Sequence, residues 1–174
     1  MPARPLVLFP DPRLARPADP VDAFGPDDAF GPEVAALAGD VRDTLLAASA
    51  LGLTAPHIGV PARIAVIRMT PEADPRVYVN PALLWASAET ATHDEGSVSM
   101  PGLRERITRP ARIRFGYRDL DGLAHEAEAD GFPAAIVQHE MDQLDGIFWI
   151  DRLSRLKRER LLKRFGKLRP APSP

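Results

Sequence analysis

The fold is indicated most strongly by residues 134–150, which read AAIVQHEMDQLDGIFWI. On a helix, His139 and Gln143 lie one turn apart, so both side chains can face one point. Glu140, the neighbour of His139, can reach the same point from the side. With histidine in place of Gln143 the pattern would be H-E-x-x-H, in which two imidazoles hold a metal and the glutamate is a general base. The stretch therefore predicts a helix with a metal-type site, although a plain amphipathic helix has the same spacing.

Two stretches upstream accompany this helix, residues 50–59 (ALGLTAPHIG) and residues 95–102 (EGSVSMPG). Together with QHEMDQLDG they closely resemble the three signature motifs of the peptide deformylase family, which read roughly GxGLAAxQ, EGCLS and QHExDHLDG. The resemblance covers roughly residues 5 to 165, or almost the whole chain. It implies an α+β fold with antiparallel sheets around a central HExx(H/Q) helix, an N-terminal helix and a basic C-terminal helix. It also implies a metal-dependent hydrolase that removes the formyl group from N-formylmethionyl peptides.

The metal-ligand positions depart from the family's pattern. In the family, the cysteine of EGCLS and both histidines of HExDH bind a divalent metal, commonly ferrous iron. This chain has Ser97 and Gln143 at two of these three positions, so only His139 is an intact ligand. The resemblance implies that Glu140 is retained as the general base.

The oxyanion side of the cleft has changed as well. The motif-one glutamine, which in the family helps to hold the oxyanion, is His57 in this chain. The resemblance also implies that Gly52 lies at the substrate and that the backbone N–H of Val98 faces the developing oxyanion.

These departures should weaken metal binding. An apparent metal affinity of roughly 10–16 kcal/mol, shared over four ligands, corresponds to about 3–4 kcal/mol for each ligand. Replacing two ligands by poor donors then loses on the order of 6–8 kcal/mol. A serine hydroxyl stays protonated near neutral pH, and a glutamine carbonyl suits harder cations. We therefore expect no tightly bound cofactor, and any metal that binds should be a single divalent ion of Fe, Ni, Co or Zn.

Three functions are compatible with these residues. In the first, the metal site is degenerate, deformylation is weak or absent, and the cleft still binds a peptide N-terminus or a small acyl ligand. In the second, the chain is an active amide hydrolase in which His57 and His139 hold a metal in a rebuilt site. Gln143 or water would complete that site, with Glu140 as the general base. In the third, no metal is used, and Ser97 and His139 act as a nucleophile–base pair.

Length and composition indicate one domain. The 174 residues, 45% of them hydrophobic, can bury a real core, and we expect a single domain at 1–169 and a disordered Pro-rich tail at 170–174. There is no cysteine, so neither a disulfide nor a thiolate ligand is available. Because no apolar run approaches about 18 residues and the N-terminus lacks the apolar core of a signal peptide, we expect a cytoplasmic protein without membrane contact.

Apolar spacing predicts the remaining elements. Residues 33–51 have helical spacing and should form the first long helix. Pro133 should open the motif helix, where a missing amide hydrogen costs nothing. Residues 10–32 carry repeated turn signals and should form an irregular arm, and His93 is expected in a surface loop. Short β-type runs are predicted at residues 63–69, 76–80, 83–88, 112–118 and 122–129.

Positive charge is concentrated near the C-terminus. Residues 152–169 contain nine basic residues and one acidic residue, a net +8, whereas the rest of the chain has a net −10. Leu153, Leu156, Leu161 and Phe165 give this segment an apolar stripe, so it should be a helix docked on the body. Its basic side chains can simply form a solvated face, or they can contact a polyanion with release of counterions. A basic C-terminal helix is associated with the ribosome in the family, so the resemblance implies rRNA.

Overall fold

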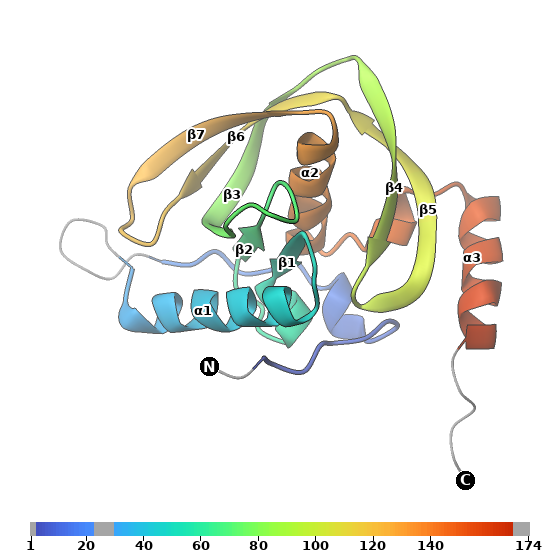
Figure 1. Ribbon diagram of the computed structural model, residues 1–174, viewed down its shortest axis with the longest axis horizontal. Helices are drawn as coiled ribbons and strands as arrows, with labels where there is room; N and C mark the ends of the chain where they lie inside the picture. The colour runs from blue at the N-terminus through green and yellow to red at the C-terminus, as the bar shows by residue number, and fades with distance from the viewer. Residues whose placement is uncertain (1–2, 23–29, 169–174) are drawn as a thin grey trace, which may run out of the picture.

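In the computed structural model, residues 3–22 and 30–168 are described, and they form three α-helices and seven strands (Figure 1). In chain order these are α1 (Pro32–Ala47), β1 (Gly52–Thr54), β2 (Ile64–Ile67), β3 (Arg76–Ala86), β4 (Thr90–Ser97), β5 (Met100–Pro110), β6 (Arg112–Arg118), β7 (Ala124–Asp130), α2 (Phe132–Leu144) and α3 (Arg155–Leu168). Short 3-10 helices add η1 (Pro12–Ala15), η3 (Ala55–Ile58) and η4 (Trp149–Arg152). The strands form an antiparallel sheet of order β1-β2-β3-β6-β7 and an antiparallel β4-β5 pair, which confirms the predicted α+β class.

The structure does not describe every segment of the predicted domain. The predicted tail at 170–174 and residues 23–29 of the predicted arm lie outside the described residues. The boundaries of the single domain therefore stay a prediction.

Helix α2 lies between the two sheets. Gly131 precedes it with a φ of 63°, a conformation that a side chain would strain, and Pro133 occupies its first turn as predicted. Its apolar side chains join one core cluster with Ile113 and Phe115 of β6. Figure 1 shows the helix enclosed by β3, β6 and β7 on one side and by β4 and β5 on the other. The motif residues are thus carried on a helix held from two sides.

Residues 76–80 and 83–88 were predicted as two strands, but β3 runs continuously through both regions to Ala86. Asn80 has a φ of 50°, and the pairing with β6 shifts register just beyond it. Pro81 follows at this irregular point, where its missing amide hydrogen interrupts no regular ladder. The two predicted runs are therefore one strand with an irregular register.

The β4-β5 hairpin was not predicted. Its first strand, TATHDEGS, contains no large apolar residue, so it lacks the apolar period that marks a half-buried strand. The expectation of His93 in a surface loop is wrong, because this residue lies in β4. Its Nε2 is buried without a hydrogen-bond partner in the described chain, and its ring lies 5.4 Å from that of Phe132. The hairpin is what brings the second motif to the cleft, since β4 ends at Ser97.

Helix α1 confirms the predicted first helix but ends at Ala47, four residues before the predicted end. Ser49 has a φ of 53°, and the amide of Ala50 donates to the carbonyl of Leu45 at 3.0 Å, so the chain turns away here. The helix packs on β1 and β2 through a cluster that includes Leu45 and Leu53. The early end leaves residues 49–51 free to form a wall of the cleft.

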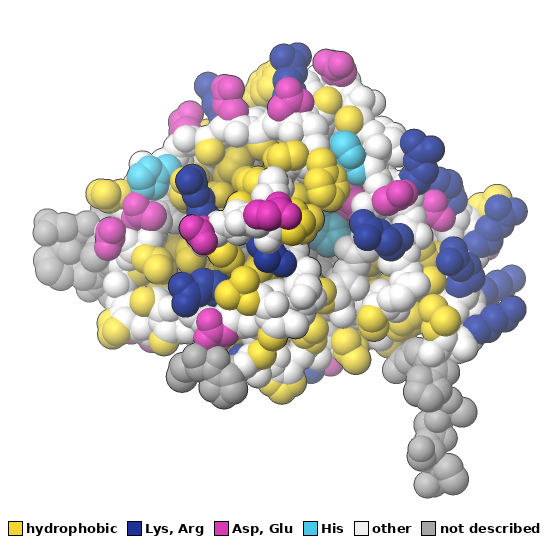
Figure 2. Space-filling view, in the orientation of Figure 1, with side chains coloured by type: hydrophobic (Ala, Val, Ile, Leu, Met, Phe, Trp, Pro, Cys, Tyr) yellow, Lys and Arg dark blue, Asp and Glu magenta, His cyan; other side chains and the backbone are white. Residues whose placement is uncertain are grey.

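Helix α3 confirms the predicted basic helix. Leu161 and Phe165 are buried, whereas Leu156 is 57% exposed, so its predicted place in the docking stripe is wrong. Lys and Arg side chains gather over this helix in Figure 2. The implied contact with rRNA stays a prediction. None of the helices in the described part of the chain is long and apolar enough to cross a membrane.

Candidate functional site

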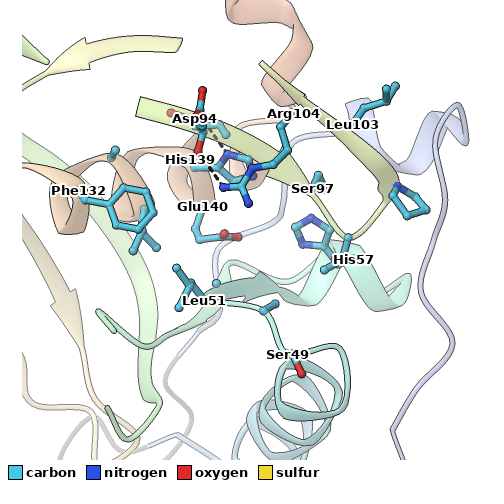
Figure 3. A pocket seen from close by; sticks show the side chains of 18 residues that line it. Ser49, Leu51, His57, Asp94, Ser97, Leu103, Arg104, Phe132, His139 and Glu140 are labelled. Carbon is cyan, nitrogen blue, oxygen red and sulfur yellow. Dashed lines mark hydrogen bonds and ion pairs between the residues drawn. The ribbon is translucent and has the colours of Figure 1, made fainter. Parts of the chain in front are cut away.

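A cavity of about 410 Å³ lies between α2, the β4-β5 hairpin and the segment that joins α1 to η3. All three sequence motifs line it, and Figure 3 shows Ser97, His57, His139 and Glu140 around the same hollow. Gly52 and Val98 line it as well, whereas Gln143 is not part of its wall. The other wall residues include Leu51, Leu103, Phe132, Ala135 and Ile136 on the apolar side and Asp94, Glu95 and Arg104 on the polar side.

His139 is oriented by a carboxylate. Its Nδ1 lies 2.9 Å from Glu95 Oε2. Burial alone would raise the pKa of Glu95, but hydrogen bonds from His139 and Arg109 lower that pKa to about 2. Because an ionised carboxylate only accepts, Nδ1 of His139 donates, and Nε2 is the nitrogen left for a ligand in the cavity. Burial by itself would lower the pKa of His139, yet the bond to Glu95 and the charge of Glu140 raise it.

Behind His139 lies a buried network of charges. Arg109 donates to Glu95 through Nε at 2.6 Å and Nη2 at 2.9 Å, and to Asp142 through Nη1 at 2.7 Å. Arg152 also binds Asp142, with its Nε 2.8 Å from the same Oδ2 and its Nη2 donating to Oδ1. Sequence reasoning missed all of these residues. Glu95 and Asp142 lie inside two of the motifs, which was a usable signal, but Arg109 lies in no motif and gave none.

Glu140 is a buried carboxyl in the wall of the cavity. Gly52 leaves room for its side chain, because a Cβ at that position would overlap Glu140 Oε1. The residue is 4% exposed, and Oε2 has no hydrogen-bond partner among the described residues. Burial raises the pKa of Glu140 to about 7, against the opposing charge of His139. A group with this pKa can both hold and release a proton near neutral pH.

His57 is a hydrogen-bond donor toward the cavity. The backbone N–H of Thr54 donates to its Nδ1 at 3.0 Å, and the Thr54 hydroxyl lies 2.8 Å from the same atom. Nδ1 is thus the acceptor of the neutral ring, and the proton is on Nε2. Burial, together with the nearby His139, lowers the pKa of His57 to about 3, so the ring stays neutral. A neutral N–H donor suits a carbonyl oxygen better than a metal ion.

The other two changed positions already have partners. Ser97 Oγ accepts a hydrogen bond from the amide of Ser99 at 3.1 Å, and no hydrogen bond in the described chain joins it to His139. Gln143 is buried and donates through Nε2 to the carbonyl of Leu14 at 2.7 Å, away from the cavity. Within residues 3–22 and 30–168 there is no cluster of three or more His, Asp or Glu side chains that could hold a metal ion. The polar side chains at the cavity therefore do not fit the family's metal.

The contact between Gln143 and Leu14 should be structural. Replacing Gln143 by Met keeps the side-chain length but leaves the buried Leu14 carbonyl without its donor. We expect the free energy of unfolding to fall by about 1–3 kcal/mol, the cost of one unsatisfied buried group. Urea unfolding of both proteins measures the difference. A change below about 0.5 kcal/mol, the range of neutral surface substitutions, would contradict the structural assignment.

Comparison with known proteins agrees with this fold. A family model described as polypeptide deformylase matches residues 3–159. Proteins named "Peptide deformylase-like" are 53% identical in Bradyrhizobium diazoefficiens, over 97% of this chain and 95% of that protein, and 50% identical in Brucella melitensis, over 97% and 99%. The crystal structure of peptide deformylase from Ehrlichia chaffeensis in complex with actinonin superposes with a TM-score of 0.88 at 30% identity, over 98% of this chain and 100% of that one.

These likenesses establish the fold class and the family. The arrangement of three helices and antiparallel sheets around an HExx helix is the α+β fold of solved peptide deformylases. The chain belongs to the polypeptide deformylase family, as the three motifs predicted.

Proposed function

We propose that the cleft binds a peptide N-terminus or a small acyl ligand without metal-dependent removal of a formyl group. One observation carries the proposal: three of the polar side chains at the family's positions make hydrogen bonds unsuited to metal binding. Ser97 accepts from Ser99, and Gln143 donates to Leu14 outside the cavity. His57 accepts from Thr54 and presents a proton rather than a lone pair. His139 alone keeps a nitrogen that suits a metal.

The expected loss of metal affinity supports a degenerate metal site. Each lost ligand is worth about 3–4 kcal/mol of an apparent affinity of roughly 10–16 kcal/mol. Loss of two ligands then weakens metal binding by roughly four to six decades. Gln143 is held by its buried bond to Leu14, and its side chain is not part of the cavity wall. The Ehrlichia relative is described in complex with actinonin, which supports a cleft that still accepts a ligand.

The proposal is tested by metal content. We expect close to zero metal per chain after anaerobic purification and exposure to Fe, Ni, Co and Zn. A double variant, Ser97→Cys with Gln143→His, restores both family ligands and should hold close to one equivalent. Elemental analysis of both proteins measures this, and a formyl-peptide assay on the same samples relates metal to activity.

Other results of this experiment would contradict the proposal. One equivalent in the native protein, lost in His57→Ala, would favour the rebuilt site of His57 and His139, with Glu140 as the base. Formate release by native protein that holds no metal would favour Ser97 as a nucleophile. The proton that His57 presents and the missing bond between Ser97 and His139 make both alternatives the weaker interpretations.

A further inference from the structure

The C-terminal end of β3 carries an exposed apolar patch. Leu83, Leu84 and Trp85 are 48%, 48% and 49% exposed, although successive residues of a strand point to opposite faces and large apolar side chains are usually buried. Leu83 pairs with Phe115, on the face that packs on α2. The register shifts between Leu83 and Trp85, and Leu84 lies over Gly116. Leu84 and Trp85 therefore both lie on the outer face of the sheet, opposite to α2.

The helices leave this outer face open to solvent. Among the described residues, the apolar cluster under α1 includes Val79 of β3 and no later residue of that strand. Figure 1 shows α1 at the end of the molecule away from the junction of β3 with β4. Helix α2 packs on the other face of the sheet, through Tyr78 and Phe115. Leu84 and Trp85 are thus apolar side chains that the described chain does not cover.

One edge of β3 is open beside the patch. Strand β2 pairs with β3 only from Arg76 to Val79, whereas β6 pairs with it as far as Ala86. In the part of the chain that the structure describes, the backbone of residues 82–86 makes no hydrogen bond outside the ladder with β6. The N–H and C=O groups that point away from β6 can therefore pair with another strand.

The patch and its surroundings carry little net charge. Residues 77–88 (VYVNPALLWASA) contain no charged side chain. Exposed edges are commonly protected by lysine or another charge, so an edge without charge does not repel its own copy. Two arginines of the neighbouring β6 are paired, Arg112 with Glu89 at 3.7 Å and Arg114 with Glu126 at 4.0 Å. With a net charge of −2, repulsion between whole molecules is weak as well.

We infer that two copies of this protein associate through residues 82–86 of β3, edge to edge and antiparallel about a two-fold axis, with Leu84 and Trp85 packed against their counterparts. A contact of this kind uses the same surface on both copies and closes at a dimer. Three side chains are few against the roughly 800 Å² that each partner buries in a stable complex, so the dimer is weak, with a Kd on the order of 10–100 µM. No residue of β3 lines the cavity, so association leaves the cleft open.

Sedimentation velocity tests the inference. The full-length protein is measured between about 5 and 500 µM, a range that brackets the expected Kd. We expect the sedimentation coefficient to rise from that of a monomer to that of a dimer and to stop there. The same rise is expected in about 1 M NaCl, where charges are screened beyond about 3 Å, because an apolar contact does not depend on attraction between charges.

Tryptophan fluorescence locates the contact in the native protein. The chain has two tryptophans, and Trp149 is 2% exposed whereas Trp85 is half exposed. Burial of Trp85 in the dimer should reduce quenching by acrylamide and shift the emission to shorter wavelength as the concentration rises. Trp149 is already shielded and should not contribute to the change. A dimer that forms without a change in quenching would have its contact elsewhere and would overturn the inference.

A matched pair of variants tests the patch directly. Leu84→Lys adds a charge to the edge, and we expect this variant to stay monomeric at about 500 µM. Leu156→Lys makes the same change at a leucine that is 57% exposed on α3 and should dimerise like the native protein. If Leu84→Lys dimerises as well as Leu156→Lys does, the edge of β3 is not the interface.

Three further outcomes would overturn the inference. The first is a native protein that stays monomeric over the whole concentration range. The second is a dimer that dissociates in about 1 M NaCl, because that result would indicate a contact between the basic α3 and the acidic remainder of another copy. The third is growth beyond the dimer, which a two-fold contact does not permit.

Discussion

Replacing Glu140 by Gln is expected to stabilise the protein at pH 8 by about 3 kcal/mol. The carboxyl is 4% exposed, and burial raises its pKa from 4.5 to about 7. The folded state therefore holds this proton more tightly than the unfolded state does. Between pH 4.5 and 7 the native protein loses stability as pH rises, by about 1.4 kcal/mol for each pH unit. The glutamine variant lacks this loss.

Urea unfolding at pH 4.5, 6 and 8, with EDTA present, measures the effect. The difference between native protein and Glu140→Gln should be small at pH 4.5 and largest at pH 8. Glu128→Gln, an exposed change of the same kind, should follow the native protein at every pH. A constant difference across this range would mean that Glu140 titrates as an exposed carboxyl does.

A stabilising Glu140→Gln would bear on function as well. A buried acid that lowers stability at the working pH is retained at a cost, which is a common property of functional residues. The same carboxyl has an oxygen without a partner in the described chain. Both features indicate a group adapted to a ligand rather than to the stability of the fold.

Short sequence patterns predicted those helices and strands that are marked by a few neighbouring residues. The run RIRFGYR predicted β6 at residues 112–118, since its apolar and basic residues alternate with a period of two. Pro133 marked the start of α2. The β4-β5 hairpin escaped because the first strand has few large apolar residues, and its stability comes from pairing along its length. Pro81 suggested that the strand ends at Asn80. Strand β3 instead continues to Ala86, and Asn80 has a positive φ.

The sequence placed four of the altered or retained positions, Ser97, His57, His139 and Glu140, around one cleft, because a family resemblance fixes which positions meet. It could not indicate where each side chain points. Gln143 bonds to Leu14, 129 positions away, and no local pattern carries that contact. The hydrogen on His57 likewise depends on a bond from Thr54 that exists only in the folded turn.

Replacing Glu95 by Gln is expected to lower the free energy of unfolding at pH 7 by about 3–5 kcal/mol. The change removes the charge that faces Arg109 and His139, and leaves a buried guanidinium short of its partner. Asp142 still binds Arg109 at 2.7 Å, which favours the lower end of this range. The result would show that the buried network, and not the cleft surface, holds His139 in place.

The pH dependence of the free energy of unfolding and a comparison with an exposed ion pair test the role of Glu95. In the native protein the pKa of Glu95 is lowered from 4.5 to about 2, so its contribution is complete above pH 4.5 and is lost as pH falls toward 2. Glu95→Gln should lack that acid-induced loss. Glu89→Gln breaks an exposed pair with Arg112 at 3.7 Å and should cost less than about 1 kcal/mol. If the two variants prove equally stable, burial adds nothing to the Glu95 pair, and His139 must owe its orientation to packing on α2 alone.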